Sequence, residues 1–138
     1  MAAPRSRQAL RFYRASGRRF EEAQFLFVRG GYTTAAVYLA GYGVECILKA
    51  LILSREPESR HVHTLGTFRG AHAHAFEWLG LRLSERAVTF PADARKELAR
   101  ITKWTTHLRY DPGTIKPRDA KAFLNAAEKV IQWADGRI

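Results

Sequence analysis

The chain has 138 residues, of which 46% are hydrophobic, so it fits one folded domain and does not fit a disordered chain. Its only cysteine, Cys46, excludes an intrachain disulfide framework and a multi-cysteine zinc site, and fits a reducing compartment. The formal net charge of +10 favours nucleic acid, a nucleotide phosphate or an acidic protein as the partner.

The positive charge is concentrated in two segments. Residues 1–29 contain seven arginines and two glutamates, and residues 95–118 contain seven lysines or arginines and two acidic residues. Each segment therefore has a net charge of +5, which together equals the net charge of the chain. Such segments indicate a surface for phosphates, or else solvated basic faces with no dedicated partner.

Helical spacing dominates the first half of the chain. Residues 6–29 are predicted to form a helix that ends at the turn "RGGY", because its apolar residues recur at helical intervals. Those residues are Tyr13, Phe20, Ala23 and Phe27. The next helix, from residue 33 or 34 to about 54, is apolar nearly all round, which indicates the central, buried helix. Glu45 and Lys49 interrupt its apolar run, so we do not expect it to span a membrane.

Three more helices are predicted in the second half. They cover about 64–79, from Pro91 to the Asp111-Pro112-Gly113 turn, and from about 117 to a stop at Gly136. No segment shows the alternation of a strand. We therefore expect an all-α, up-down bundle of about five helices, forming a single domain over 1–138 with loose ends at 1–5 and 135–138.

Two helical faces carry polar side chains. On the central helix, Tyr38, Tyr42, Glu45 and Lys49 fall within about 60° of one another. We expect Glu45 to pair with Lys49 or another cation, unless the stripe simply faces water.

The second polar face lies on the predicted helix that starts at Pro91. If that helix is continuous, it places four side chains on one face: Arg100, Lys103, Trp104 and His107. Arginine clamps phosphate, histidine transfers protons near neutral pH, and an indole stacks on bases. The alternative is a basic helix end, which the helix dipole favours in any case.

Three motifs of the sequence occur together in one family. "GGYTTAAVYLAGYGVECILKALIL" has a Gly-Tyr turn before a helix with tyrosines and a Glu-x-x-x-Lys-Ala ending, and "HTL" follows at 63–65. Arg100 and His107 have six residues between them, and "LRY" follows at 108–110. In these features the chain resembles the HEPN family (higher eukaryotes and prokaryotes nucleotide-binding), over about residues 6–134. The family's signature is an arginine, four to six residues, and a histidine.

The resemblance implies a metal-independent endoribonuclease that acts as a homodimer, with catalytic Arg100 and His107. In it, the ribose 2′-hydroxyl attacks the adjacent phosphate, His107 assists proton transfer and Arg100 stabilises the developing charge. A continuous helix would separate the two residues by about 10.5 Å, so we expect residues of two chains to converge on one cleft. We expect the remaining residues of the segment to hold RNA: Lys103, Trp104, Arg109 and Tyr110.

The resemblance also leaves other functions open. Such a nuclease can be the toxin of a toxin–antitoxin or defence pair, with a nucleotidyltransferase as its antitoxin partner. Other HEPN domains are non-catalytic modules that bind nucleotides or a minimal nucleotidyltransferase. In one subgroup the tyrosine two residues after the histidine is adenylylated, but here Arg109 holds that position and Tyr110 follows. A third reading is a basic helical protein that binds nucleic acid without specificity.

Metal and membrane functions receive little support from the sequence. His61, His63, His72 and His74 form two His-x-His pairs, but no carboxylate cluster accompanies them, so we expect no metal and no cofactor. The N-terminal residues lack the apolar region of a secretory signal, and we expect a cytoplasmic protein without a membrane partner.

Overall fold

The computed structural model describes residues 3–138, which form six α-helices and contain no strand. The helices are α1 (Arg7–Phe25), α2 (Thr33–Ser54), α3 (His61–Thr67), α4 (Phe76–Ser84), α5 (Ala92–Ile101) and α6 (Pro117–Asp135). Short helical turns lie between them: η1 (Leu26–Gly30), η2 (Glu58–Arg60), η3 (Ala71–His74) and η4 (Thr106–Tyr110). The expected all-α bundle is confirmed, with six α-helices where about five were expected.

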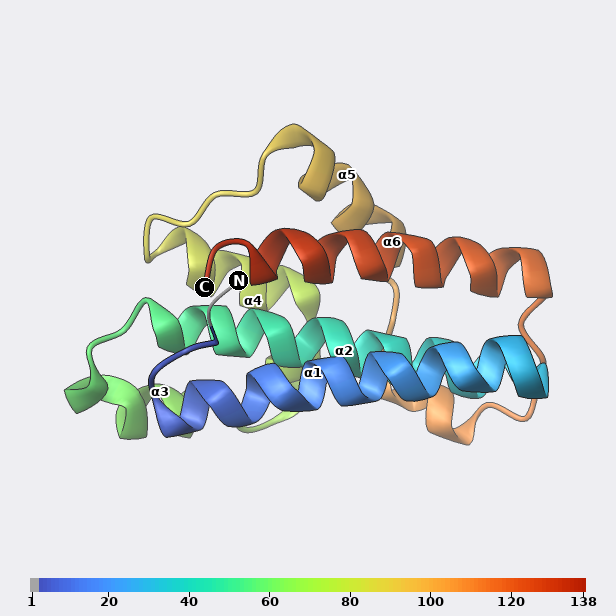
Figure 1. Cartoon of the computed structure of the whole chain (residues 1–138), viewed down its shortest axis with the longest axis horizontal. Coiled ribbons are helices and arrows are strands. Elements are labelled where there is room, and N and C mark those ends of the chain that lie inside the picture. The colour runs from blue at the N-terminus through green and yellow to red at the C-terminus, as the bar shows by residue number, and fades with distance from the viewer. Residues whose placement is uncertain (1–2) are drawn as a thin grey trace.

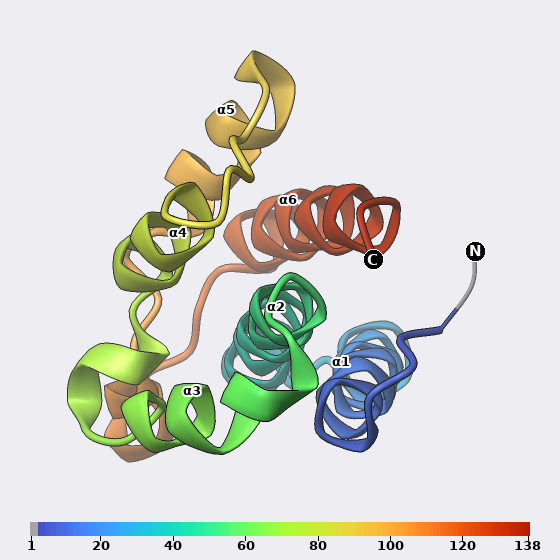
Figure 2. The same ribbon diagram turned by 90° about the vertical axis from the view of Figure 1, so that its left-hand side faces the viewer.

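Helix α2 is the centre of the bundle, as its composition predicts. It packs against α1, α4 and α6, and α5 packs on the outer side of α6 (Figures 1 and 2). Helix α1 runs antiparallel to α2, whereas α6 runs in the same direction as α2 (Figure 1). Helix α2 is long and apolar enough to cross a membrane, but 78% of its most apolar window is buried, as in the core helix of a soluble protein.

The hairpin of α1 and α2 follows from local sequence signals. Ser6 caps α1, because its Oγ accepts a hydrogen bond from the Ala9 amide at 3.0 Å. Gly31 adopts φ 68° at the end of η1, a conformation that costs glycine little, and so turns the chain into α2. The two helices approach closely where the Ser16 hydroxyl donates to the Gly43 carbonyl at 2.6 Å, and a Cβ on Gly43 would lie 3.3 Å from the Ser16 carbonyl.

Two expected helices are interrupted in the structure. The helix expected over 64–79 is divided into α3 and α4, with Gly70 at φ 88° and the turn η3 between them. The continuous helix expected from Pro91 to residue 110 is wrong, because α5 ends at Ile101 and His107 belongs to the separate turn η4. Thr105 breaks the helix there in an extended conformation and caps η4, with its Oγ1 accepting from the His107 amide at 3.3 Å.

The described ends of the chain contact the bundle. Pro4 is buried, and Ile138 is partly buried against the core. The Arg55 side chain donates to the Arg137 carbonyl at 2.8 Å. Of the segments expected to be loose, residues 1–2 lie outside the described residues.

Candidate active site

The polar stripe of α2 carries an ion pair and a third, unexpected member. Glu45 Oε2 accepts from Lys49 Nζ at 2.8 Å, and both side chains are only 5% exposed. The expected pairing of these two residues is therefore present. The other carboxylate oxygen, Oε1, lies 2.8 Å from Nδ1 of His74, which is 38% exposed and ends η3. Since an ionised carboxylate only accepts hydrogen bonds, Nδ1 is the donor of this contact.

Aromatic rings continue the stripe toward the N-terminus of α2. The Tyr38 and Tyr42 hydroxyls are 3.4 Å apart, and their rings meet edge to face. The Tyr42 ring also lies edge to face with the His74 ring, at 6.3 Å between centroids. Burial, followed by the hydrogen bond with Tyr38, raises the pKa of the Tyr42 hydroxyl far above its ordinary value. The Tyr42 hydroxyl is therefore neutral, and the Tyr42 ring packs against the His74 ring.

Trp104 is part of the core. Its side chain is 5% exposed, lies 5.1 Å from the Tyr42 ring and stacks on Phe76 at 5.3 Å between centroids. Gly41 makes room for the indole, since a Cβ there would lie 2.0 Å from the ring. The expectation of an exposed Trp104 beside Arg100 is therefore wrong, and its indole is not available to stack on a base. The cause is the end of α5 at Ile101, which turns residue 104 toward α2.

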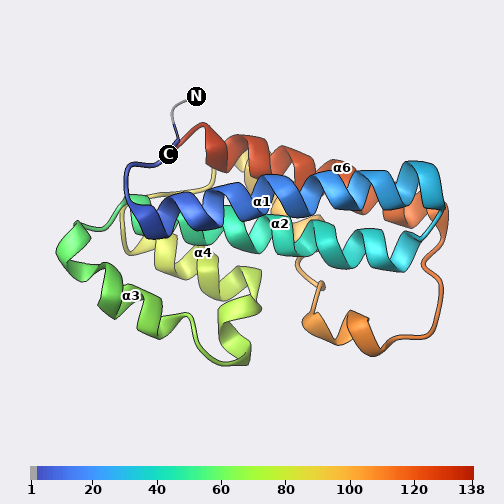
Figure 3. The same ribbon diagram turned by 60° about the horizontal axis from the view of Figure 1, so that its bottom comes forward.

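His107 lies on a pocket that joins two distant parts of the chain. The pocket has a volume of about 310 Å³ and is lined from one side by residues of η3 and α4, including His74 and Glu77. From the other side, residues 102 and 104–107 line it, including exposed His107. Figure 3 shows η3 and η4 on the same side of α2. The structure therefore places His107 on the same pocket as His74, which is bonded to Glu45 of the polar stripe.

Arg100 does not line that pocket. Its guanidinium is 54% exposed and lies 3.3 Å from Glu97, one turn earlier on α5. Glu97 also lies 3.7 Å from Lys129 of α6, so Arg100 belongs to a surface cluster between α5 and α6. Within one chain, the structure does not bring Arg100 and His107 to the same cavity.

The other expected RNA-binding residues are exposed near His107. Lys103, Arg109 and Tyr110 are exposed, and the Arg109 guanidinium lies 4.8 Å from the centre of the Tyr110 ring. The side chains of Tyr110 and Tyr38 raise the pKa of Arg109. Arg109 therefore remains a cation beside the tyrosine end of the stripe.

The chain after η4 is fixed to the start of α2. Thr33 Oγ1 donates to the Ile115 carbonyl at 2.6 Å, and Thr34 Oγ1 accepts from the Ile115 amide at 3.1 Å. Trp104 and Ile115 thus anchor the two ends of a segment that carries His107, Arg109 and Tyr110.

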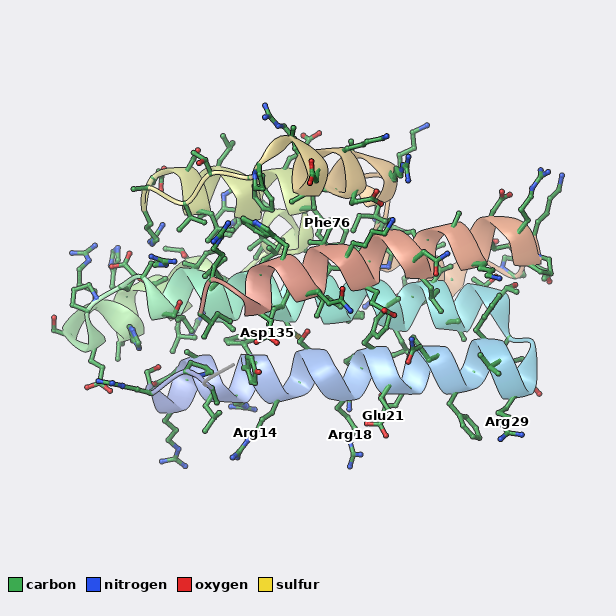
Figure 4. The ribbon with its side chains drawn as sticks, turned by 45° about the horizontal axis from the view of Figure 1, so that its top comes forward. Arg14, Arg18, Glu21, Arg29, Phe76 and Asp135 are labelled. Atoms are coloured by element: carbon green, nitrogen blue, oxygen red, sulfur yellow. The ribbon has the colours of Figure 1, made fainter. Side chains whose placement is uncertain are left out.

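Two arginines of α1 and the helix α5 lie on opposite sides of the bundle. Arg14 and Arg18 point outward from the side of α1 that faces away from α5 and Phe76 (Figure 4). Helices α2 and α6 lie between α1 and α5 (Figure 2). Arg14 and Arg18 therefore do not share a surface with α5.

Comparison with known proteins identifies the family. The family model described as the HEPN domain matches residues 9–137, nearly the whole chain. The chain belongs to the HEPN family. No curated protein and no solved structure is similar enough to add to this assignment. A HEPN domain is consistent with a nuclease or with a nucleotide-binding module. The choice between these two functions therefore depends on the site residues.

Sequence reasoning missed His74. The signal was present, because a buried glutamate has two oxygens and Lys49 satisfies only one of them. From the sequence alone, His74 is interpreted only as an improbable metal ligand, together with the other histidines. Among residues 3–138, no group of three or more His, Cys, Asp or Glu side chains is placed to hold a metal ion.

Proposed function

We propose that this HEPN chain is a metal-independent endoribonuclease that acts in the cytoplasm as a homodimer. The observation that carries the proposal is the position of His107, which is exposed at a pocket, with the exposed cations Lys103 and Arg109 close to it in the chain. An RNA phosphate is attracted by these cations, and an imidazole at the same place transfers protons near neutral pH.

The reaction is attack of the ribose 2′-hydroxyl on the adjacent phosphate, which leaves a 2′,3′-cyclic phosphate. His107 transfers a proton, and Arg100 stabilises the negative charge of the transition state. Arg100 lies outside the pocket of its own chain. In a two-fold dimer, Arg100 of one copy lies close to His107 of the other copy. A toxin role, with a nucleotidyltransferase as antitoxin, belongs to this proposal.

The dimer has a direct test. Sedimentation equilibrium at micromolar concentration will give the mass of two chains. A species with the mass of one 15.7 kDa chain throughout this range would remove the interface on which Arg100 depends.

The activity is tested with matched variants on mixed RNA and on DNA of the same sequence. Arg100→Ala and His107→Ala will each lower the rate of RNA cleavage by at least about a hundredfold. The controls are Arg95→Ala on the same helix and His63→Ala on α3, both at exposed positions, and these will cleave like the wild type. Wild-type cleavage will persist in chelator and will spare DNA, which lacks the 2′-hydroxyl. Equal rates in all five proteins would refute the assignment of Arg100 and His107.

One observation favours a second function, the non-catalytic module. Arg100 already has a carboxylate partner in Glu97 and is separated from the pocket of His107. In that case the wild type will bind RNA or a nucleotide through its basic surfaces and leave it intact.

A further inference from the structure

His74 has the geometry of a positioned general base. Its Nδ1 is bound to Glu45 Oε1 at 2.8 Å, which leaves Nε2 as the ring nitrogen free to react. A carboxylate at Nδ1 fixes the tautomer with a lone pair on Nε2 and stabilises the imidazolium that forms when Nε2 takes a proton.

The support of His74 is buried and rigid. Glu45 is 5% exposed and is itself held by Lys49 from the next turn of α2, so its carboxylate cannot rotate without breaking an ion pair. The Tyr42 ring stands edge to face against the imidazole. His74, by contrast, is 38% exposed and lines the pocket. A buried carboxylate that aims a partly exposed histidine into a pocket is more than core packing requires.

The packing also fixes His74 relative to His107. Phe76 follows His74 by two residues and Trp104 precedes His107 by three, and these two rings stack at 5.3 Å with 7° between their planes. The stack joins the segment that carries His74 to the segment that carries His107. Both histidines line the same pocket of about 310 Å³.

We propose that His74 and His107 form an acid–base pair for RNA cleavage, in which His74 is the base and His107 is the acid. This inference rests on the proposed function and adds a second catalytic residue from the same chain. Nε2 of His74 takes the proton of the ribose 2′-hydroxyl as the bond from 2′-oxygen to phosphorus forms. The bond from phosphorus to the 5′-oxygen breaks, and protonated His107 gives its proton to that oxygen. The charges balance without a metal or a co-reactant, and exchange with solvent restores both rings.

Glu45 is a positioning residue in this scheme, because it acts through His74. The pocket has a volume of about 310 Å³, and Thr102, Thr105 and Thr106 are among its lining residues. Since the proposed reaction needs a 2′-hydroxyl beside a phosphodiester, the substrate class is a ribonucleoside phosphodiester.

The key variant is His74→Asn. Its amide retains an N–H donor toward Glu45 but has no ring nitrogen to carry a proton, so it separates the chemical role from the structural one. We expect a melting temperature near that of the wild type and a fall in kcat on RNA of at least about a hundredfold, with little change in KM. His63→Asn, at an exposed position on α3, is the control and will cleave normally.

The leaving group tells the base from the acid. Uridine 3′-(4-nitrophenyl phosphate) releases a nitrophenolate that needs no protonation, so an acid contributes little to its cleavage. On this substrate His107→Ala will recover most of its rate, whereas His74→Asn will remain as slow relative to the wild type as it is on RNA.

Each result decides the matter. Full activity of His74→Asn together with loss in His107→Ala would overturn the pair and leave the proposed function standing. If the His74 variant, and not the His107 variant, recovers its rate on the activated ester, the assigned roles of base and acid are overturned. An inactive wild type on RNA and on the activated ester would overturn the proposed function and the pair together. If His74→Asn does not fold, His74→Gln replaces it. Retained activity of His74→Gln on RNA would refute the assignment of His74 as the base.

Discussion

Replacing Gly41 with alanine will test the packing that places His107. A Cβ at this position lies 2.0 Å from Cε2 and Nε1 of Trp104 and 2.4 Å from its Cδ2. Since non-bonded carbon atoms pack at about 3.5–4.0 Å, the indole must retreat by about 1.5 Å. It has little room to do so, because it is 5% exposed and stacked on Phe76.

The magnitude follows from two opposing effects. Alanine is favoured over glycine in a helix by about 1 kcal/mol. Expelling a buried tryptophan costs about 3–5 kcal/mol, the range for Trp→Ala in a core. The net loss in the free energy of unfolding is therefore about 2–4 kcal/mol. Expulsion of the Trp104 ring also displaces η4, which carries His107, so the rate of RNA cleavage falls in the same variant.

Urea unfolding followed by far-UV circular dichroism measures this loss. The matched control is Gly17→Ala, in the middle of α1, where nothing lies within 4 Å of the added Cβ. That change will stabilise the chain by about 0.5–1 kcal/mol. In the double variant Gly41→Ala/Trp104→Leu, the loss in the free energy of unfolding will be smaller than the sum of the two single losses, because the two residues share one contact. A Gly41→Ala variant as stable as Gly17→Ala would refute the reasoning.

Three further variants probe burial and charge. Glu45→Ala leaves Lys49 buried without its carboxylate and will cost about 3–5 kcal/mol in urea unfolding; an unchanged midpoint would contradict the buried pair. Burial raises the pKa of the Cys46 thiol from 9.0 to about 11, so the folded chain keeps a proton that the unfolded chain releases. Stability will therefore fall as pH rises from 9 toward 11, and thermal melts will show a shallower fall for Cys46→Ala; equal slopes would exclude the effect. Replacing Arg14 and Arg18 with alanine will reduce the salt dependence of RNA binding, read as the slope of log K against log salt, by about 1–2 if RNA contacts α1; an unchanged slope places RNA elsewhere.

The long helices were predictable from sequence because their signals are local. Ser6 caps α1, two glycines end η1, and Pro117 starts α6, so the observed bounds lie close to the expected ones. The ion pair of Glu45 and Lys49 was predictable for the same reason, since i, i+4 spacing on a helix brings the two side chains together.

The end of α5 was not predictable in this way. Residues 102–107 continue a plausible helical pattern, but α5 ends at Ile101 and Trp104 packs against Gly41 of α2. Periodicity does not show that the side chain lying against Gly41 is that of Trp104. The contact of His74 with Glu45 is equally long-range, and periodicity carries no information about it.

The anchoring of residues 104–115 has a kinetic consequence. The segment contacts α2 through Trp104 at one end and through Ile115 at the other, while the exposed residues His107, Arg109 and Tyr110 of η4 lie between them. Release of one anchor opens the segment without unfolding the hairpin of α1 and α2, so its free energy of opening is well below that of global unfolding. In hydrogen exchange, the amide of His107 will exchange far sooner than those in the middle of α2. We therefore expect the pocket that holds both histidines to open and re-form many times within the lifetime of one folded molecule.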